Sequence, residues 1–325
     1  MKKHSLWVRA LLFSVAFSVG SSCTDDYTDV TGTNRIAVVF TPQLEGNEPL
    51  PSSSRVVNTT WSGGEEVGVA MLNSGAGITG TSSFAKYGVA VSAGSEVTFS
   101  PSGSEDILYF PTDAGKNVNF AAFSPYTDIN GTKVTYDGFA GQSTQAGMES
   151  VDFIYCKDDT DYNKNSTGPV VLNFSHQLRK LLIKIKTTND LAAIDLTGIT
   201  GVEVSRLPAG VQIDLSDLTL TPSGAAGTRF FGASKSVSQV TYTAIVVPHD
   251  TSKQTGNTGR VLKVYMGSGS FEYHFSDSFS LASGSVYTFN FTLSKTGLEQ
   301  VGSTTITGWD GATVGDGSTG NIEMN

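Results

Sequence analysis

Hydrophobic and polar residues alternate with a period of two along much of the chain. In VYTFNFTLS at 286–294, the four apolar residues from Tyr287 to Leu293 fall on one face of an extended strand, and the polar residues between them fall on the other. The same strand pattern recurs at 36–41 (IAVVFT), 181–186 (LLIKIK), 211–215 (VQIDL), 240–247 (VTYTAIVV), 262–266 (LKVYM) and 271–275 (FEYHF). The sequence therefore predicts an all-β protein.

The connections between these strands are short and rich in Gly, Ser, Asn and Pro. Strands that recur at intervals of about ten residues are typical of antiparallel sandwiches. A turn or two of helix fits only 176–182 and 190–196. The polar stretch KDDTDYNKNSTGP at 157–169 is interpreted as a linker. We predict two tandem antiparallel β-sandwich domains, at 36–165 and 166–310, and a Gly-rich tail at 311–325.

The N-terminus has the pattern of a secretory signal. Basic residues precede a mainly apolar stretch at 10–19, and its ten residues span only about 15 Å as a helix, too short to cross a bilayer. Cys23 follows three small residues, as the lipid-bearing cysteine of a bacterial lipoprotein does, although Gly20 stands where Leu, Val or Ile is usual. We predict removal of 1–22 and a lipidated leader, 23–55, that carries the first strand. Ordinary signal cleavage that leaves a spare thiol is the alternative.

Composition narrows the function classes. The chain has 21 Lys and Arg against 30 Asp and Glu, a net charge of −9, and no dense basic run, which disfavours a nucleic-acid partner. It has two cysteines, so lipid on Cys23 leaves Cys156 without a partner and excludes a disulfide framework. Cys156, in DFIYC, is predicted to be a small half-buried strand residue rather than a reactive thiol.

Two motif-like patterns are interpreted as structural. Asp159, Asp161 and Asn163 have the spacing of calcium ligands, but the Gly and Glu that an EF-hand loop needs further on are missing, so a solvated linker explains them. Glycine patterns at 75–80 (GAGITG) and 315–320 (GDGSTG) lack the following helix that a nucleotide site needs, and the first is predicted to be a hairpin turn.

Catalytic signatures are missing from the sequence. His176, His249 and His274 are isolated from one another, and there is neither a GxSxG nor an HExxH motif. His274 is predicted to lie on the polar face of a strand, and His249 in a turn. We expect no catalytic residue, no metal ligand and no cofactor.

Several segments occur in a distinctive order along the chain. They are RIAVVF at 35–40, Arg55 and Trp61 before EEVGVAML, YFPTDAGKNVNFAAFSPY at 109–126, DFIYCK at 152–157, VVLNFSHQLRKLLIKIK at 170–186, AIVVPH at 244–249, GSVYTFNFTLSKTGL at 284–298 and ITGW at 306–309. This ordered set resembles the fimbrillin family of surface lipoproteins and pilus subunits of Bacteroidetes.

The resemblance implies two β-sandwiches, the first transthyretin-like, and a role in fimbriae and adhesion. It implies an outer-membrane surface location through lipid on Cys23, whose neighbours at 24–26 resemble an acidic export signal. In polymerising members, an Arg-specific protease cuts after the first strand, and a strand from a neighbouring subunit fills the vacated groove. The implied partners are other pilus subunits and a host protein or glycan ligand.

In this chain the strand to be lost would be 36–41, and the cut would follow Arg55, after the exposed-type segment GNEPLPSSS at 46–54. A plain surface arginine is the alternative. The tail after Trp309 has few apolar anchors, so either 301–309 supplies the donated strand or the chain is an accessory or tip subunit. The competing function is a monomeric glycan-binding lipoprotein, for which Trp61 and Trp309 would have to be exposed; core packing is expected of both.

Overall fold

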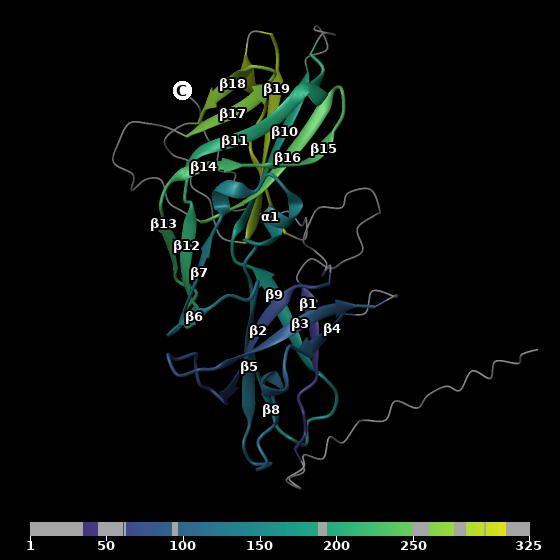
Figure 1. Cartoon of the computed structure of the whole chain (residues 1–325), viewed down its shortest axis with the longest axis vertical. Helices are drawn as coiled ribbons and strands as arrows, with labels where there is room; N and C mark the ends of the chain where they lie inside the picture. The colour runs from purple at the N-terminus through teal and green to yellow at the C-terminus, as the bar shows by residue number, and fades with distance from the viewer. Residues whose placement is uncertain are drawn as a thin grey trace, which may run out of the picture.

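The structure is a computed structural model, and it describes residues 35–44, 61, 63–92, 97–187, 194–248, 260–275, 284–295 and 297–309. The described part of the chain is almost entirely β-structure, arranged in four sheets, which confirms the predicted class (Figure 1). Several predicted features lie outside the described residues: the signal at 1–22, Cys23, Arg55, His249, the glycine pattern at 315–320 and the tail at 311–325.

A seven-stranded sheet occupies the lower half of Figure 1. Its order is β1 (Phe40–Leu44), β9 (Val170–His176), β8 (Ile154–Tyr162), β5 (Val118–Ser124), β2 (Glu66–Asn73), β3 (Phe84–Val91) and β4 (Val97–Pro101). The central strand β5 reads VNFAAFS and is buried on both faces, as continuous apolar strands are. Phe120 and Ala122 pack into one core, whereas Ala121 and Phe123 pack into another.

The upper half is a sandwich of two sheets. The first sheet contains β15 (Phe231–Lys235), β16 (Gln239–Val246), β10 (Arg179–Thr187), β19 (Ser285–Leu293) and β20 (Leu298–Gln300), with β21 (Thr305–Gly308) also paired to β19. The second contains β14 (Ala226–Arg229), β11 (Ile199–Leu207), β17 (Val261–Met266) and β18 (Gly269–His274). The apolar residues of β19, from Tyr287 to Leu293, are buried between the sheets as predicted.

The fourth sheet joins segments from the two parts of the chain. Its strands are β13 (Leu220–Ser223), β12 (Gly210–Asp214), β7 (Lys133–Asp137) and β6 (Ile129–Asn130). Tyr136 of β7 lies opposite Val211 of β12, and both pack into a core that includes residues of β5 and of β16. This middle core connects the upper and lower halves of Figure 1.

Helical structure is limited to short segments in the described residues. They are α1 (Gln145–Glu149) and the 3₁₀ turns η1 (Ser104–Asp106), η2 (Phe139–Gly141) and η3 (Leu196–Gly198). None of the helices in the described ranges is long and apolar enough to cross a membrane. The turn of helix that the sequence allows at 176–182 is not present: β9 ends and β10 begins there, because Leu181 and the alternate residues after it face the upper core. Of 190–196, the residues 190–193 lie outside the described ranges, and Leu196 begins η3.

The predicted linker at 157–169 is not a break between sheets. Residues 157–162 continue strand β8, and the following turn leads to β9 in the same sheet, with Ile154 opposite His176. The segment is polar because the outer part of β8 is largely exposed, not because it separates domains. The division predicted at 165/166 therefore falls inside a β-hairpin.

The strand directions also differ from a purely antiparallel prediction. β1 pairs with β9 in parallel, and so does β10 with β19. Parallel neighbours need a long crossover connection, and between β10 and β19 the chain runs through the other two sheets of the C-terminal half before it returns. The alternation of apolar and polar residues along a strand shows which face is buried, but it does not show whether the neighbouring strand runs parallel or antiparallel.

Candidate functional site

The first strand lies at an edge of the seven-stranded sheet. β1 runs parallel to β9, with Phe40 opposite Val170 and Leu44 opposite Phe174. Just before it, Ala37 forms an isolated antiparallel bridge with Tyr109, so the predicted strand at 36–41 is divided between two partners. The Val170 amide donates to the carbonyl of residue 39 at 2.8 Å, and the amide of residue 38 donates to the carbonyl of residue 108 at 2.9 Å. The segment 36–44 is therefore held by backbone hydrogen bonds along its length.

The side chains of this segment alternate between groove and solvent. Val38, Phe40, Pro42 and Leu44 are buried, whereas Val39 is 65% exposed. The Phe40 ring meets Tyr87 and Phe120 edge to face, with centroids 5.3 Å and 5.2 Å away. Such aromatic contacts add to the free energy gained by burial. Removing β1 would open an apolar groove with Phe120 and Tyr87 at its centre.

Trp61 belongs to the same core. Its ring lies edge to face with Phe99 at 5.7 Å and with Phe174 at 5.3 Å. β1 also contacts β4, at the opposite edge of the sheet, so the sheet curls around these aromatic residues. The expectation that Trp61 packs in a core is confirmed, and this residue offers no aromatic platform on the surface.

The groove continues past the end of β1 into a cavity of about 250 Å³. Leu44, Trp61, Pro125 and Ile154 form its apolar walls. Its polar lining includes Glu65, Glu66, Glu149, Asp152 and His176. An extended segment bound in place of β1 would have room for a further side chain at this end, in acidic surroundings.

His176, at the end of β9, joins this groove to the C-terminal strand. Its Nδ1 atom lies 3.0 Å from Oδ1 of Asp152, and Trp309 stacks on the imidazole with centroids 3.8 Å apart and planes 8° apart. Nζ of Lys180 lies 4.7 Å from the Trp309 ring centroid. Burial lowers the pKa of Lys180 to about 8, and the nearby Asp152 opposes that shift. Trp309, directly after β21, is thus packed at the junction, as expected from the sequence.

The other candidate residues are engaged in structural contacts. Cys156 is 3% exposed, and burial, with a smaller contribution from Asp158, raises the pKa of its thiol to about 12, so the reactive thiolate is disfavoured. Asp159 pairs with Lys157 at 3.1 Å, and Asp161 accepts hydrogen bonds from two asparagine side chains. Within the described ranges, no three His, Cys, Asp or Glu side chains gather as a metal site.

Two smaller predictions are confirmed. The glycine pattern at 75–80 lies in the connection between β2 and β3, which pair antiparallel, so it is a hairpin turn. The His274 side chain is 71% exposed at the end of β18, beside Glu272. The contacts among Asp152, His176, Lys180 and Trp309 were not foreseen; the only signal was a pair of charged residues, 179–180, inside an apolar run.

The fold agrees with what the comparisons show. A family model described as fimbrillin-like matches residues 54–309, which is most of the chain. The chain belongs to the fimbrillin-like family. The match begins after β1 and one residue before Arg55.

The relatives of this fimbrillin-like chain are bacterial. It is 27% identical to a protein of Bacteroides uniformis named "Putative fimbrium subunit Fim1C", over 99% of this chain and 100% of that protein. It is similar in fold to a crystal structure described as a "putative cell adhesion protein" from Bacteroides uniformis, with a TM-score of 0.61, 21% identity, and coverage of 86% of this chain and 99% of the other. A protein of the same description from Bacteroides ovatus gives a TM-score of 0.60, 18% identity, and coverage of 85% and 98%.

Proposed function

We propose that this fimbrillin-like chain is a cell-surface fimbrial subunit that serves adhesion and assembles by exchange of strand β1. The observation that carries the proposal is the position of β1: it is an edge strand whose buried side chains fill an apolar groove. A vacated groove presents unpaired backbone groups of β9 together with apolar pockets, and a donated strand satisfies both. Its partners are then other subunits of the same kind of fibre.

The proposal is supported by the family and by the named relative, a fimbrium subunit by its description. In the precursor, lipid on Cys23 would tether the chain to the outer membrane. Cleavage after Arg55 would remove the lipid and β1 together, because both precede the cut. The role is structural, and no catalytic step is proposed.

The candidate donor strand of this chain has fewer apolar anchor residues than the β1 segment that fills the groove. β21 is short, pairs with only the first half of β19, and is followed by Trp309. The candidate donor segment 301–309 has three apolar residues, Val301, Ile306 and Trp309, compared with four buried residues in the segment 38–44. A donor with few anchors binds less strongly, so we place the chain as an accessory or tip subunit in preference to a stalk subunit.

The test compares two forms of the chain. A protein that begins at Val56 is mixed with the precursor, and its complexes are followed by gel electrophoresis in detergent without heating. A ladder of multimers identifies a self-polymerising stalk subunit. An accessory or tip subunit gives no ladder by itself, and its open groove is detected by adding a synthetic donor strand, the peptide of residues 35–46. A chain that begins at Arg35 keeps β1 and is the matched control, expected to stay monomeric.

Only monomers from both forms, with no complex to any donor strand, would refute strand exchange. If such monomers were also retained on a polysaccharide column, the monomeric glycan-binding lipoprotein would be the better description.

A further inference from the structure

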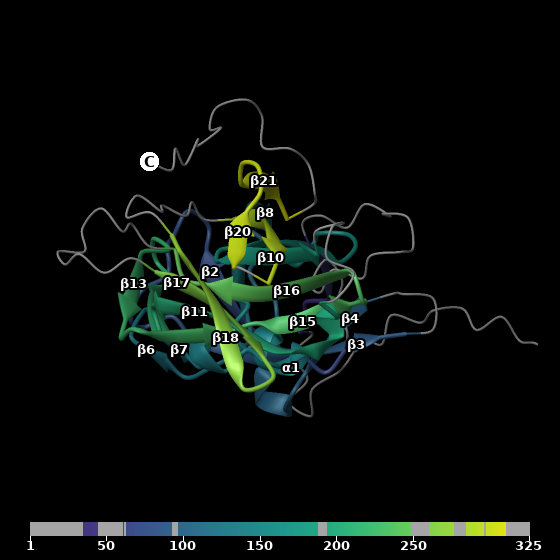
Figure 2. The same cartoon turned by 90° about the horizontal axis from the view of Figure 1, so that it is seen from above.

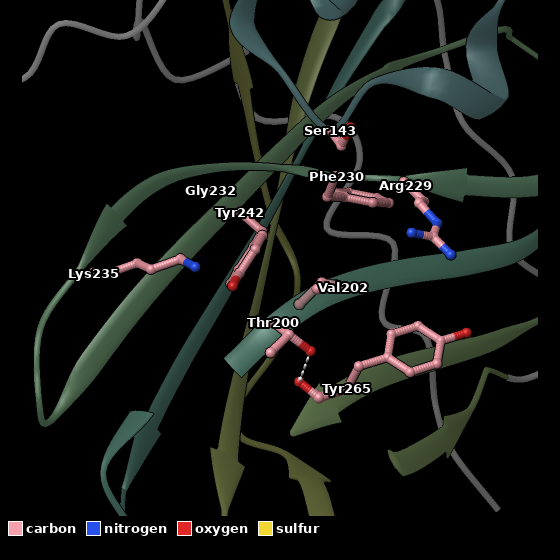
Figure 3. A pocket seen from close by; sticks show the side chains of 10 residues that line it. Ser143, Thr200, Val202, Arg229, Phe230, Gly232, Lys235, Tyr242 and Tyr265 are labelled. Atoms are coloured by element: carbon pink, nitrogen blue, oxygen red, sulfur yellow. Dashed lines mark hydrogen bonds between the residues drawn. The ribbon is translucent and has the colours of Figure 1, made fainter. Parts of the chain in front are cut away.

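A second cavity lies in the C-terminal half, between β11, β14, β15, β16 and β17 (Figure 3). Its volume is about 120 Å³, and it adjoins a shallower hollow of about 370 Å³ that runs to the turn between β17 and β18. The two share Thr200, Gly201, Arg229 and Tyr265. Together they form one elongated site, called here the Arg229 cavity. This cavity lies among the sheets of the C-terminal half, whereas the β1 groove belongs to the seven-stranded sheet.

Two backbone irregularities shape the Arg229 cavity. The pairing of β11 with β17 shifts register between Ile199 and Gly201, and that of β15 with β16 shifts between Gly232 and Ser234. Each irregularity places a glycine in the lining. A Cβ atom added at Gly232 would lie 3.0 Å from Cε of Lys235, so a larger residue would crowd the cavity. Bulges of this kind are common beside binding sites because they redirect side chains.

The charge of the Arg229 cavity is opposite to that of the chain. Its lining contains Arg229 and Lys235 but no Asp or Glu, although the whole chain has a net charge of −9. The cavity beyond Leu44, by contrast, is lined by four carboxylates. A cationic cavity in an acidic protein attracts an anionic ligand.

The side chain of Arg229 is positioned to bind an anionic ligand. Its Nε atom lies 3.6 Å from Oε2 of Glu203, while its side chain remains 67% exposed. Figure 3 shows the guanidinium extending from β14 over the neighbouring strand β11, which carries Val202, with Tyr265 on the far side of that strand. Two parallel N–H groups match the geometry of a carboxylate. Lys235 marks the other end of the cavity, where Nζ donates to the Ile199 carbonyl at 3.1 Å.

The remaining lining is that of a sugar site. The Tyr265 ring forms one wall, and the Thr200 hydroxyl lies beside it, donating to the Tyr265 carbonyl at 3.4 Å (Figure 3). Further hydroxyl groups come from Ser143, Ser268 and Ser270. A ring face packs on the apolar side of a pyranose, while hydroxyl groups exchange hydrogen bonds with its polar rim. A bare inorganic anion would bind the arginine but would make no contact with the Tyr265 ring.

We propose that the Arg229 cavity binds a sugar that carries a carboxylate, with Arg229 holding the carboxylate and Tyr265 packing against the sugar ring. Uronic acids and sialic acids are two groups of this class. The proposal concerns the folded subunit alone and does not depend on strand exchange, so it can fail or succeed separately from the proposed assembly.

Two matched probes test it: methyl β-D-glucuronide and methyl β-D-glucoside, which differ only in the carboxylate. Binding to the purified chain is followed by NMR titration, with the methyl α-glycoside of N-acetylneuraminic acid and its neutral methyl ester as a second matched pair and acetate as the bare anion. We expect each acidic sugar to bind about 10- to 100-fold more tightly than its neutral counterpart, as a charge-assisted hydrogen-bond pair predicts. Equal affinities, binding of neither acidic sugar, or acetate binding as tightly as the glucuronide would overturn the proposal.

Substitutions assign the binding to the cavity. Arg229→Gln should remove the preference for the acidic sugar, whereas Lys116→Gln, an equal change of charge at an exposed site before β5, should leave it unchanged. Tyr265→Phe keeps the ring and should keep the binding, and Tyr265→Ala should weaken binding of both sugars. Unchanged glucuronide binding in the Arg229 variant would refute the assignment, and circular dichroism verifies that each variant is folded.

Discussion

Phe40 is the residue on which the contact between β1 and its groove depends most. Its side chain is 3% exposed and lies between Tyr87 and Phe120. Truncation to Ala leaves a cavity among these rings, so we expect Phe40→Ala to lower the free energy of unfolding by about 3–5 kcal/mol. Urea denaturation followed by fluorescence measures the change. Val39→Ala, at a site that is 65% exposed, is the matched control and should change it by less than about 0.5 kcal/mol. Equal effects of the two substitutions would mean that β1 does not fill the groove as described.

Lys180 makes stability depend on pH. Burial lowers the pKa of its amine to about 8 from the ordinary 10.5. Between these two values the unfolded chain retains a proton that the folded chain has released, so this residue's contribution to stability increases as pH rises through that window. We expect the stability difference between the native chain and Lys180→Met to change with pH in that direction.

Denaturation curves of both proteins from pH 7 to about 10.5 measure this difference. The raised pKa of Cys156, about 12, acts in the opposite direction, and subtracting one protein's curve from the other's cancels it. Identical pH slopes in the two proteins would show that Lys180 is not the residue responsible.

For single residues, the sequence predicts whether a side chain is buried better than it predicts which other residues that side chain contacts. The interior positions of Trp61, Trp309 and the apolar residues of β19 follow from residue type and alternation. The contacts of Trp309 with His176 and Lys180 join segments more than a hundred residues apart, and nothing local to either segment encodes them. The Arg229 cavity was missed for the same reason, because its lining comes from five strands and depends on two bulges.

At the scale of elements, β1 should behave as a separable part of the sheet. We expect a chain that begins at Val56 to bind a synthetic peptide of residues 35–46 and to gain thermal stability, because the peptide restores the backbone pairing with β9 and the buried contact of Phe40. Differential scanning fluorimetry measures the shift in Tm. A peptide with Phe40→Asp is the control and should give no shift. Equal shifts with both peptides, or none with either, would contradict the description of the groove.

Elements are predictable where the signal is local. The strands at 181–186, 240–247, 262–266 and 286–294 follow from period-two alternation, and the structure contains each of them within one or two residues. Strand direction and pairing are not local, so the parallel pairs of β1 with β9 and of β10 with β19 were missed. Polar composition was also misleading at 157–169, because an exposed hairpin and a linker have the same solvent-facing residues.

At the scale of the whole molecule, the sheet formed by β6, β7, β12 and β13 should make the two halves unfold together. It pairs β7 with β12, and the core beneath it includes residues of β5 and β16. We therefore expect calorimetry of the chain to show a single transition. A fragment of residues 36–165 should not fold on its own, because it lacks both β9 and β12. A cooperative transition in that fragment would show that the predicted domain is independent.

The family could be predicted from the sequence, but the way in which the N-terminal and C-terminal halves of the chain are joined could not. The ordered landmarks from RIAVVF to ITGW identified the fimbrillin resemblance because most of them contain strands of the fold, and the family model covers those from residue 54 onward. The predicted boundary at 165/166 lies between β8 and β9 of one sheet, and the sheet of β6, β7, β12 and β13 joins segments from both sides of it. Composition reflects solvent exposure and does not show that strands from both sides of the boundary pair in one sheet.

The parallel alignment of β1 with β9 has a mechanical consequence for any fibre built on this groove. A pull along the length of the donated strand loads the inter-strand hydrogen bonds in shear, so that they resist together instead of opening one after another. A donated side chain seated between Tyr87 and Phe120, where Phe40 lies before cleavage, would have to leave that pocket sideways before the strand could slide. A joint of this geometry holds tension without a covalent bond between subunits, which is what an appendage exposed to flow requires.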